Sequence, residues 1–230
     1  MEKRREKILY TIVKEHIATG SPVGSEILVS KYKLGVSSAT VRNEMAELED
    51  SGFIIQPHTS AGRIPTEKAY AYYLDNLFHE KKIGANEESI ISRLMENRDE
   101  SSFRQTAKAV AQFSNQAVFW AFHQNNLYYT GISNLLAQPE FGQSDLLYDI
   151  SAIIDRVDEI IDEIYNEVKF GPQILFGSNN PFSPVCSTII SKYRLDDKVG
   201  LFGILGPIRM NYEKNLSLVK LIDNNLNKKI

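Results

Sequence analysis

The first 80 residues alternate short helical patterns with turn signals, and this alternation restricts the fold more than any other feature of the chain. The first helical pattern ends at Gly20, and Pro22 prevents its continuation. A second, shorter pattern opens at Gly24-Ser25, and a third follows the hydroxyl caps Ser37 and Ser38. The apolar residues expected to face the core recur at three- and four-residue steps: Ile8, Leu9, Ile12, Val13 and Ile17, then Ile27, Leu28 and Tyr32, then Val41, Met45 and Leu48. Helices in this arrangement are typical of a helix-turn-helix.

A hairpin is predicted directly after the third helix, which ends at Ser51-Gly52. Residues 53–56 indicate a β-strand, residues 57–62 a loop, and Arg63-Ile64 a returning strand. Thr66 can then cap a further helix, whose inward stripe is Tyr70, Tyr73, Leu74 and Leu77. Residues 1–82 are therefore predicted to form a winged helix-turn-helix domain that binds DNA.

The rest of the chain mixes helices and strands. Residues 83–115 are polar and helical, and we interpret them as a connector that offers a surface for dimerisation. Residues 116–230 form an α+β domain with a hairpin at 117–130, an amphipathic helix at 149–168, strands near 173–176, 185–192 and 199–206, and a final helix at 211–228. The fold class is therefore α+β.

Composition excludes several other classes of protein. The chain has 230 residues and one cysteine, so neither a disulfide framework nor a zinc site built from several cysteines is available. No apolar run approaches the roughly 18 residues of a membrane span, and no apolar signal core follows the charged N-terminus. These features predict a cytoplasmic protein without a membrane partner, and no residue set indicates a metal or another cofactor.

Charge is distributed unevenly. Residues 1–45 carry eight lysines and arginines against five acids, whereas residues 83–230 carry 14 against 18. A basic end on an acidic body fits a nucleic-acid-binding module joined to a regulatory module, although random variation in charge explains the numbers equally well.

The third helix carries the side chains expected to read DNA bases. Its face opposite the apolar stripe presents small and polar groups, and asparagine can bond adenine while arginine can bond guanine. A solvated helix face is the alternative, but the helix before it and the hairpin after it favour DNA. The expected base-reading residues are Ser38, Ala39, Thr40, Arg42 and Asn43.

A second set of residues is expected to contact the DNA backbone. Such contacts give salt-dependent affinity and fix the register without reading sequence. The set comprises Arg4, Arg5, Lys31 and Lys33, with His58, Thr59, Ser60 and Arg63 in the hairpin.

Several segments resemble the family of heat-inducible transcription repressors called HrcA. They are residues 19–25 (TGSPVGS) and 34–49 (LGVSSATVRNEMAELE), the highly specific run 56–66 (QPHTSAGRIPT), residues 131–141 (GISNLLAQPEF) and the ending 203–212 (GILGPIRMNY). The resemblance touches both ends and the middle of the chain. It implies a winged helix joined to a GAF-like domain, repression of chaperone operons at an inverted-repeat operator called CIRCE, and the chaperonin GroEL as a partner.

This chain departs from the family pattern in one place. Family members usually exceed 300 residues and carry an extra domain inserted in the GAF-like part, which is credited with helping dimerisation. In this chain only a short hairpin lies between the strand at Val118 and the segment that begins at Gly131. A homodimer is still expected, because two symmetric copies multiply the discrimination of one winged helix. Another surface would then have to pair the subunits, and the helices at 83–115 are one candidate.

Two other functions stay open on the sequence. The GAF-like domain could bind a metabolite and make the protein a ligand-sensing regulator, or the winged helix could serve an adaptor that binds protein. An enzyme is not expected. Cys186 adjoins an apolar strand as a packing residue would, and Asp155, Asp158, Glu159, Asp162 and Glu163 lie on the solvated face of a helix.

Overall fold

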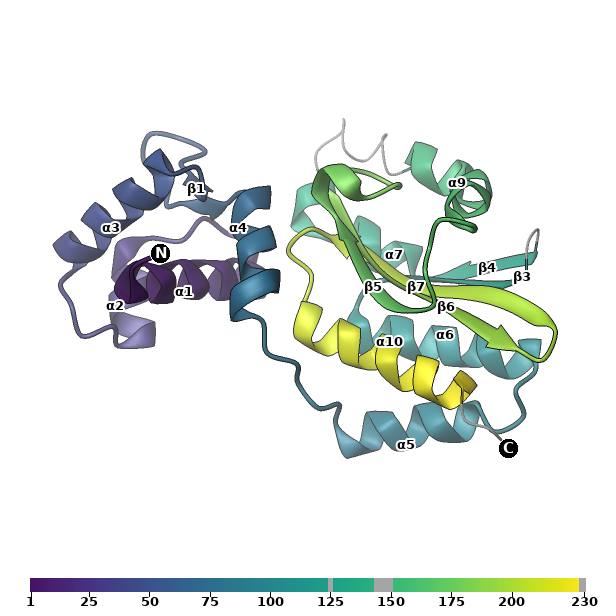
Figure 1. Cartoon of the computed structure of the whole chain (residues 1–230). Helices are drawn as coiled ribbons and strands as arrows, with labels where there is room; N and C mark the ends of the chain where they lie inside the picture. Colours follow the sequence, from purple (N-terminus) through teal and green to yellow (C-terminus); the bar gives the residue numbers. More distant parts are fainter. Residues whose placement is uncertain (124–125, 143–150, 228–230) are drawn as a thin grey trace. The chain divides into compact units, whose positions relative to one another are not determined.

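The computed structural model describes residues 1–123, 126–142 and 151–227. The chain divides into two compact units, Met1–His79 and Glu80–Ile230. Figure 1 shows both units and labels most of their helices and strands. Among the described residues, no helix is both long and apolar enough to cross a lipid bilayer.

Three helices open the first unit, with bounds close to those predicted: α1 (Lys3–Thr19), α2 (Ser25–Tyr32) and α3 (Ser38–Asp50). Gly20 ends α1 in the left-handed conformation that glycine adopts readily (φ 68°). Ser37 caps α3 by accepting a hydrogen bond from the Thr40 amide. One predicted core residue is wrong: Ile27 is 42% exposed, because Leu28 occupies the single inward stripe of this eight-residue helix.

The predicted hairpin follows α3. Strands β1 (Ile54–Ile55) and β2 (Ile64–Pro65) pair antiparallel, with Ile54 opposite Pro65 and Ile55 opposite Ile64. Thr66 then caps α4 (Glu67–Tyr72), which continues as the π-helical turn η1 (Tyr73–Leu77). The core of this unit lies between α1, α3, α4 and the hairpin, and its fully buried residues include Ile8, Leu9, Ile12, Leu28, Leu48, Ile54, Tyr70 and Tyr73.

The second unit contains a five-stranded antiparallel sheet in the order β4-β3-β7-β6-β5. Its strands are β3 (Ala117–His123), β4 (Asn126–Thr130), β5 (Gly171–Phe176), β6 (Cys186–Leu195) and β7 (Lys198–Pro207). The central pair is β7 with β6, in which Ile189 lies opposite Ile204 and Ile190 opposite Gly203. The predicted strands are thus confirmed, with slightly different ends.

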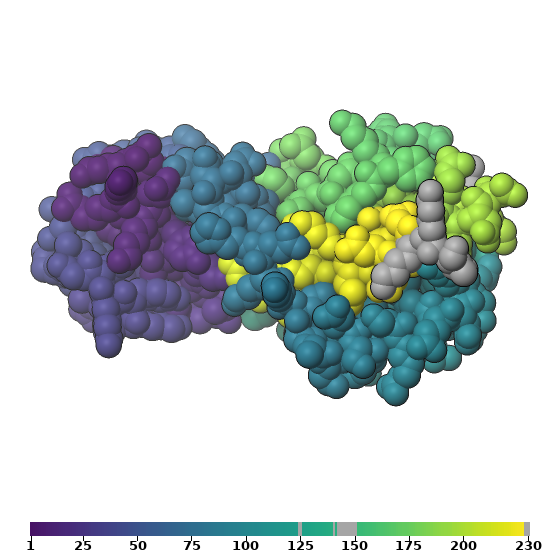
Figure 2. All heavy atoms as spheres, turned by 60° about the horizontal axis from the view of Figure 1, so that its bottom comes forward, coloured from purple at the N-terminus to yellow at the C-terminus, as the bar shows by residue number. Residues whose placement is uncertain are grey.

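Helices cover both faces of this sheet (Figure 1). One face packs against α6 (Glu100–Ser114) and α10 (Tyr212–Asn227), beside which lies α5 (Ala85–Leu94). Figure 2 shows α10 at the surface, between teal residues on one side and green residues on the other. The opposite face packs against α7 (Ile132–Leu136), the 3₁₀ turn η2 (Pro139–Gly142) and α9 (Val157–Ile164), and a further 3₁₀ turn, η3 (Gly177–Asn179), follows β5.

Two predicted helical segments also differ from the structure in the described part of the chain. The helices predicted as a separate connector at 83–115 are α5 and α6, and both belong to the second compact unit because α6 packs on β3. The helix predicted at 149–168 is interrupted at Arg156 (φ −115°, ψ 14°) and resumes as α9. Its first two predicted residues lie outside the described ones.

Candidate nucleic-acid interface

Helix α3 has two chemically different faces. Val41, Met45 and Leu48 are buried against the rest of the unit. On the other face Ala39, Arg42 and Asn43 are exposed, and the Arg42 side chain is 66% exposed. The structure therefore brings these three predicted base-reading residues onto one solvent-facing surface.

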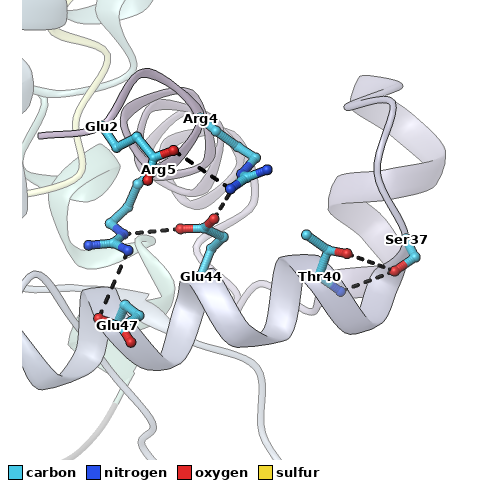
Figure 3. Close-up of polar contacts among 7 residues, drawn as sticks. All are labelled: Glu2, Arg4, Arg5, Ser37, Thr40, Glu44 and Glu47. Atoms are coloured by element: carbon cyan, nitrogen blue, oxygen red, sulfur yellow. Dashed lines mark hydrogen bonds and ion pairs between the residues drawn. The ribbon is translucent and has the colours of Figure 1, made fainter.

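The two predicted hydroxyl residues near the start of α3 are half-buried and already hydrogen-bonded within the protein. Ser38 Oγ lies 2.8 Å from Ser25 Oγ at the start of α2. Thr40 Oγ1 lies 3.0 Å from Ser37 Oγ, and the Thr40 amide donates to that same oxygen (Figure 3). Both hydroxyls thus hold the start of α3 in place.

Arg42 is directed by the start of α2. Its Nε donates to Ser25 Oγ at 3.3 Å, and Nη2 lies 3.9 Å from a Glu26 carboxylate oxygen. Because the Glu26 side chain is 86% exposed, water weakens this long ion pair strongly. The guanidinium can therefore exchange it for a stronger partner.

Arg4 and Arg5 converge on one carboxylate of α3, that of Glu44 (Figure 3). Arg4 Nε donates to Oε1 at 2.8 Å and Arg5 Nε donates to Oε2 at 3.0 Å. The hydrogen bond from Arg5 lowers the pKa of Glu44, and that from Arg4 acts in the same direction. The two arginines predicted to contact phosphates therefore also tie α1 to α3.

Lys31 has a comparable internal partner. Its Nζ donates to Glu15 Oε2 at 2.6 Å, and Tyr32 Oη donates to the same oxygen at 2.6 Å. The hydrogen bond from Lys31, followed by that from Tyr32, lowers the pKa of Glu15, whereas burial and Glu15 raise the pKa of Tyr32. Lys33, by contrast, is exposed in a left-handed conformation (φ 47°) at the end of α2.

The hairpin loop presents His58, Thr59 and Ser60 to solvent. The side-chain amide of Gln56 holds the loop from inside, donating to the carbonyls of Thr59 and Ala61 at 3.0 Å each. This bracing leaves the three predicted contact residues at the outer end of the hairpin.

Arg63 lies at the base of the hairpin and is only 22% exposed. Its Nε donates to Glu49 Oε2 at 2.8 Å. Its backbone pairs with Val23, with N–H···O distances of 2.8 and 2.9 Å. This residue, predicted as a phosphate contact, is therefore also a structural link between the hairpin, α3 and the segment before α2.

Sequence reasoning missed the residues that hold this surface together: Ser25, Glu44, Glu49, Gln56 and Gly62. A β-carbon on Gly62 would lie 2.5 Å from the Val23 backbone, so this position requires glycine. The dense run of residues 56–66 signalled importance, but the partners of Glu44 lie about 40 residues away in sequence and leave no local pattern.

None of the predicted contact residues lies in the described part of the second unit. Within the described residues, no group of three or more histidine, cysteine and carboxylate side chains could hold a metal ion. Cys186 is buried in the core, where it was predicted to pack. A hollow of about 420 Å³ at one end of the sheet is lined by aromatic and charged residues that include Phe103, Phe122 and Tyr193.

Comparisons with known proteins agree with the sequence resemblance. The family model described as "HrcA protein C terminal domain" matches residues 37–216. A heat-inducible transcription repressor HrcA from Desulforamulus reducens is 26% identical over 335 aligned positions, covering 99% of this chain and 96% of that protein. One from Pelotomaculum thermopropionicum is 48% identical over 118 positions, covering 50% of this chain and 34% of that protein.

The alignment with the Desulforamulus reducens protein spans 335 positions, which exceeds the 230 residues of this chain, so part of the relative faces gaps. A crystal structure of a hypothetical protein shares the fold, with a TM-score of 0.79, 17% identity and coverage of 98% of this chain and 97% of that one. The C-terminal domain of this family is GAF-like, and its model covers most of the second unit together with the first unit from residue 37 onward. The chain belongs to the HrcA family, whose curated members are heat-inducible transcription repressors.

Proposed function

We propose that this protein represses chaperone operons in the cytoplasm by binding an inverted-repeat, CIRCE-type operator as a homodimer, and that heating abolishes the binding. The first unit would act as a winged helix, with α3 in the major groove. The observation that carries the proposal is the exposed face of Ala39, Arg42 and Asn43 on a helix whose opposite face is buried. Family membership supports the repressor role and not that of an enzyme.

The proposed contacts fall into two groups. Arg42 and Asn43 would bond base edges, Ala39 would meet a thymine methyl, and the hydroxyls of Ser38 and Thr40 would lie at the groove edge. Lys33 and the hairpin tip would contact the DNA backbone directly. The remaining basic residues of this second group would add positive charge near the phosphates. That second group comprises Arg4, Arg5, Lys31, Lys33, His58, Thr59, Ser60 and Arg63.

Heat sensitivity needs no separate sensor site. Folded domains are stable by only about 5–15 kcal/mol, so a rise of a few degrees can depopulate the DNA-competent state. Exposed parts of α5 or α6 would supply the dimer surface, and GroEL would help to maintain the active repressor.

Footprinting tests the proposal most broadly. The full-length protein should protect an inverted repeat upstream of the chaperonin genes, with affinity that falls steeply with salt, and protection should disappear on moderate heating. Sedimentation should show dimers, and added GroEL should restore protection after heating. Failure to prefer the repeat over a scrambled duplex would rule out the repressor proposal, and a monomer at micromolar concentration would rule out the symmetric dimer.

A further inference from the structure

The carboxylate of Glu49 connects the last turn of α3 to both arms of the hairpin. Oε1 accepts a hydrogen bond from the backbone amide of Gln56 at 3.1 Å, directly after β1. Oε2 accepts one from Arg63 Nε at 2.8 Å, directly before β2. A single side chain therefore fixes both strands at the point where they leave the body of the unit.

Besides Glu49, the buried Ile54 and the Phe53 amide, which donates to the Leu48 carbonyl at 2.9 Å, hold the base of the hairpin. β1 and β2 pair through only two residue pairs, which is too little to determine how the hairpin lies against α3. The Gln56 side chain bonds within the loop itself. The backbone of Arg63 bonds Val23, and the close approach at Gly62 leaves no room for a side chain. Glu49 links the helix to the strands farther along, at Gln56 and Arg63.

An acidic side chain at this place needs an explanation, because a carboxylate beside a DNA-binding surface repels phosphates. Hydrogen bonds between ionised partners are shorter and stronger than neutral ones, and 2.8 Å for the Arg63 contact lies in that range. The gain in hairpin order can therefore outweigh the repulsion. The Glu49 side chain is also only 32% exposed, and its carboxylate oxygens contact Arg63 and the Gln56 amide.

We propose that Glu49 is a positioning residue, which orients the hairpin relative to the reading face of α3 so that the hairpin tip and α3 can contact one duplex together. This inference rests on the proposed DNA-binding function and deepens it. In this proposal the main role of Arg63 is to donate a hydrogen bond to the Glu49 carboxylate.

The test compares Glu49→Ala, which removes both hydrogen bonds, with Glu49→Gln, which can keep the one from the Gln56 amide. The matched control is Asp50→Asn, which removes an equal charge from the next, exposed position of α3. We expect Glu49→Ala to weaken operator binding about tenfold and Glu49→Gln to weaken it less. Asp50→Asn should tighten binding slightly, because it only removes repulsion.

Two further readouts separate positioning from general damage. In the free full-length protein, amide hydrogen exchange of residues 54–65 should accelerate in Glu49→Ala but not in Asp50→Asn, while residues 38–48 stay protected. On the operator, hydroxyl-radical protection should be lost at the backbone positions flanking the bases that α3 contacts.

The outcomes distinguish the two proposals. If wild-type protein binds no DNA while the exchange result holds, the proposed function fails and the positioning of the hairpin by Glu49 stands. If wild-type protein binds and Glu49→Ala binds equally or more tightly with an unchanged footprint, Glu49 does not position the hairpin. Exchange that accelerates equally along the whole unit would show that Glu49 acts in general stability, and it would also overturn the inference.

Discussion

The two compact units join their elements by different means. In the first unit, buried carboxylates link helices that are distant in sequence: Glu44 joins α3 to α1, and Glu15 joins α1 to α2. In the second unit, aromatic rings fill the space between a helix and the sheet. Phe103 of α6 stacks on Trp120 of β3 at a centroid distance of 4.7 Å.

Size explains this difference. A unit as small as residues 1–79 buries a smaller fraction of its apolar surface than a larger one and depends more on polar links between its helices. The larger second unit has helices on both sides of its sheet and buries apolar residues on both faces. Polar links should therefore contribute more to the stability of the first unit, and aromatic packing more to that of the second.

The largest expected effect is that of removing an aromatic ring from the second unit. Phe103 is 3% exposed, so Phe103→Ala should lower the free energy of unfolding of this unit by about 3–5 kcal/mol. Trp120 is the one tryptophan of the chain, and its fluorescence during urea unfolding reports on this unit alone.

Phe103→Leu is the matched control, because it keeps most of the apolar volume and should cost about 1 kcal/mol. Hydrogen exchange of residues 3–50 should not change in either variant. An equal loss of protection there would show that the two units unfold together and would remove the basis of the comparison.

A smaller effect is expected from Glu44→Gln in the first unit. The change removes the charged acceptor of two arginines and should cost about 1–2 kcal/mol, since solvent screens Arg4 in part. The control Glu47→Gln removes a charge that lies 3.9 Å from Arg5 and is 61% exposed, and it should cost almost nothing. The stability of both variants is measured by thermal unfolding of the first unit, monitored by hydrogen exchange. Equal midpoints for the two variants would contradict the role given to Glu44.

The smallest expected effect is a pH dependence confined to the first unit. Hydrogen bonds from Lys31 and Arg5 hold the pKa values of Glu15 and Glu44 below the ordinary 4.5. Their stabilising contribution is therefore complete above that value and is lost as pH falls through the lowered pKa values.

Exchange measured from about pH 6 to about pH 3, corrected for intrinsic rates, should show the first unit losing stability at the acid end. The double variant Glu15→Gln with Glu44→Gln should be less stable near pH 6 and should have a flatter profile that approaches the wild type at the acid end. An unchanged slope in the double variant would assign the acid sensitivity to other carboxylates.

Much of the fold could be predicted because its signals are local. The cap at Ser37, the left-handed glycine at Gly20 and the spacing of Val41, Met45 and Leu48 each act within a few residues. The same locality made the exposed face of α3 predictable, since a helix that buries one stripe must expose the opposite one.

The remaining features depend on contacts between distant segments. The sequence does not show that Arg5 meets Glu44 or that Arg63 meets Glu49, so it predicts phosphate contacts for the two arginines and no partner for either glutamate. The sequence predicts Ile27 to face inward, because a helix this short has too few residues to distinguish its buried face from its exposed one. The break at Arg156 carries no proline or glycine and left no signal in the sequence.

If the exposed face of α3 reads DNA bases, Asn43→Ala should change the base preference of the protein. Binding of wild type and variant to the operator and to a scrambled duplex should show a loss of about 1–3 kcal/mol on the operator only, with Arg42→Ala behaving alike. Equal losses on both duplexes, or no loss on either, would contradict the placement of this face in the groove.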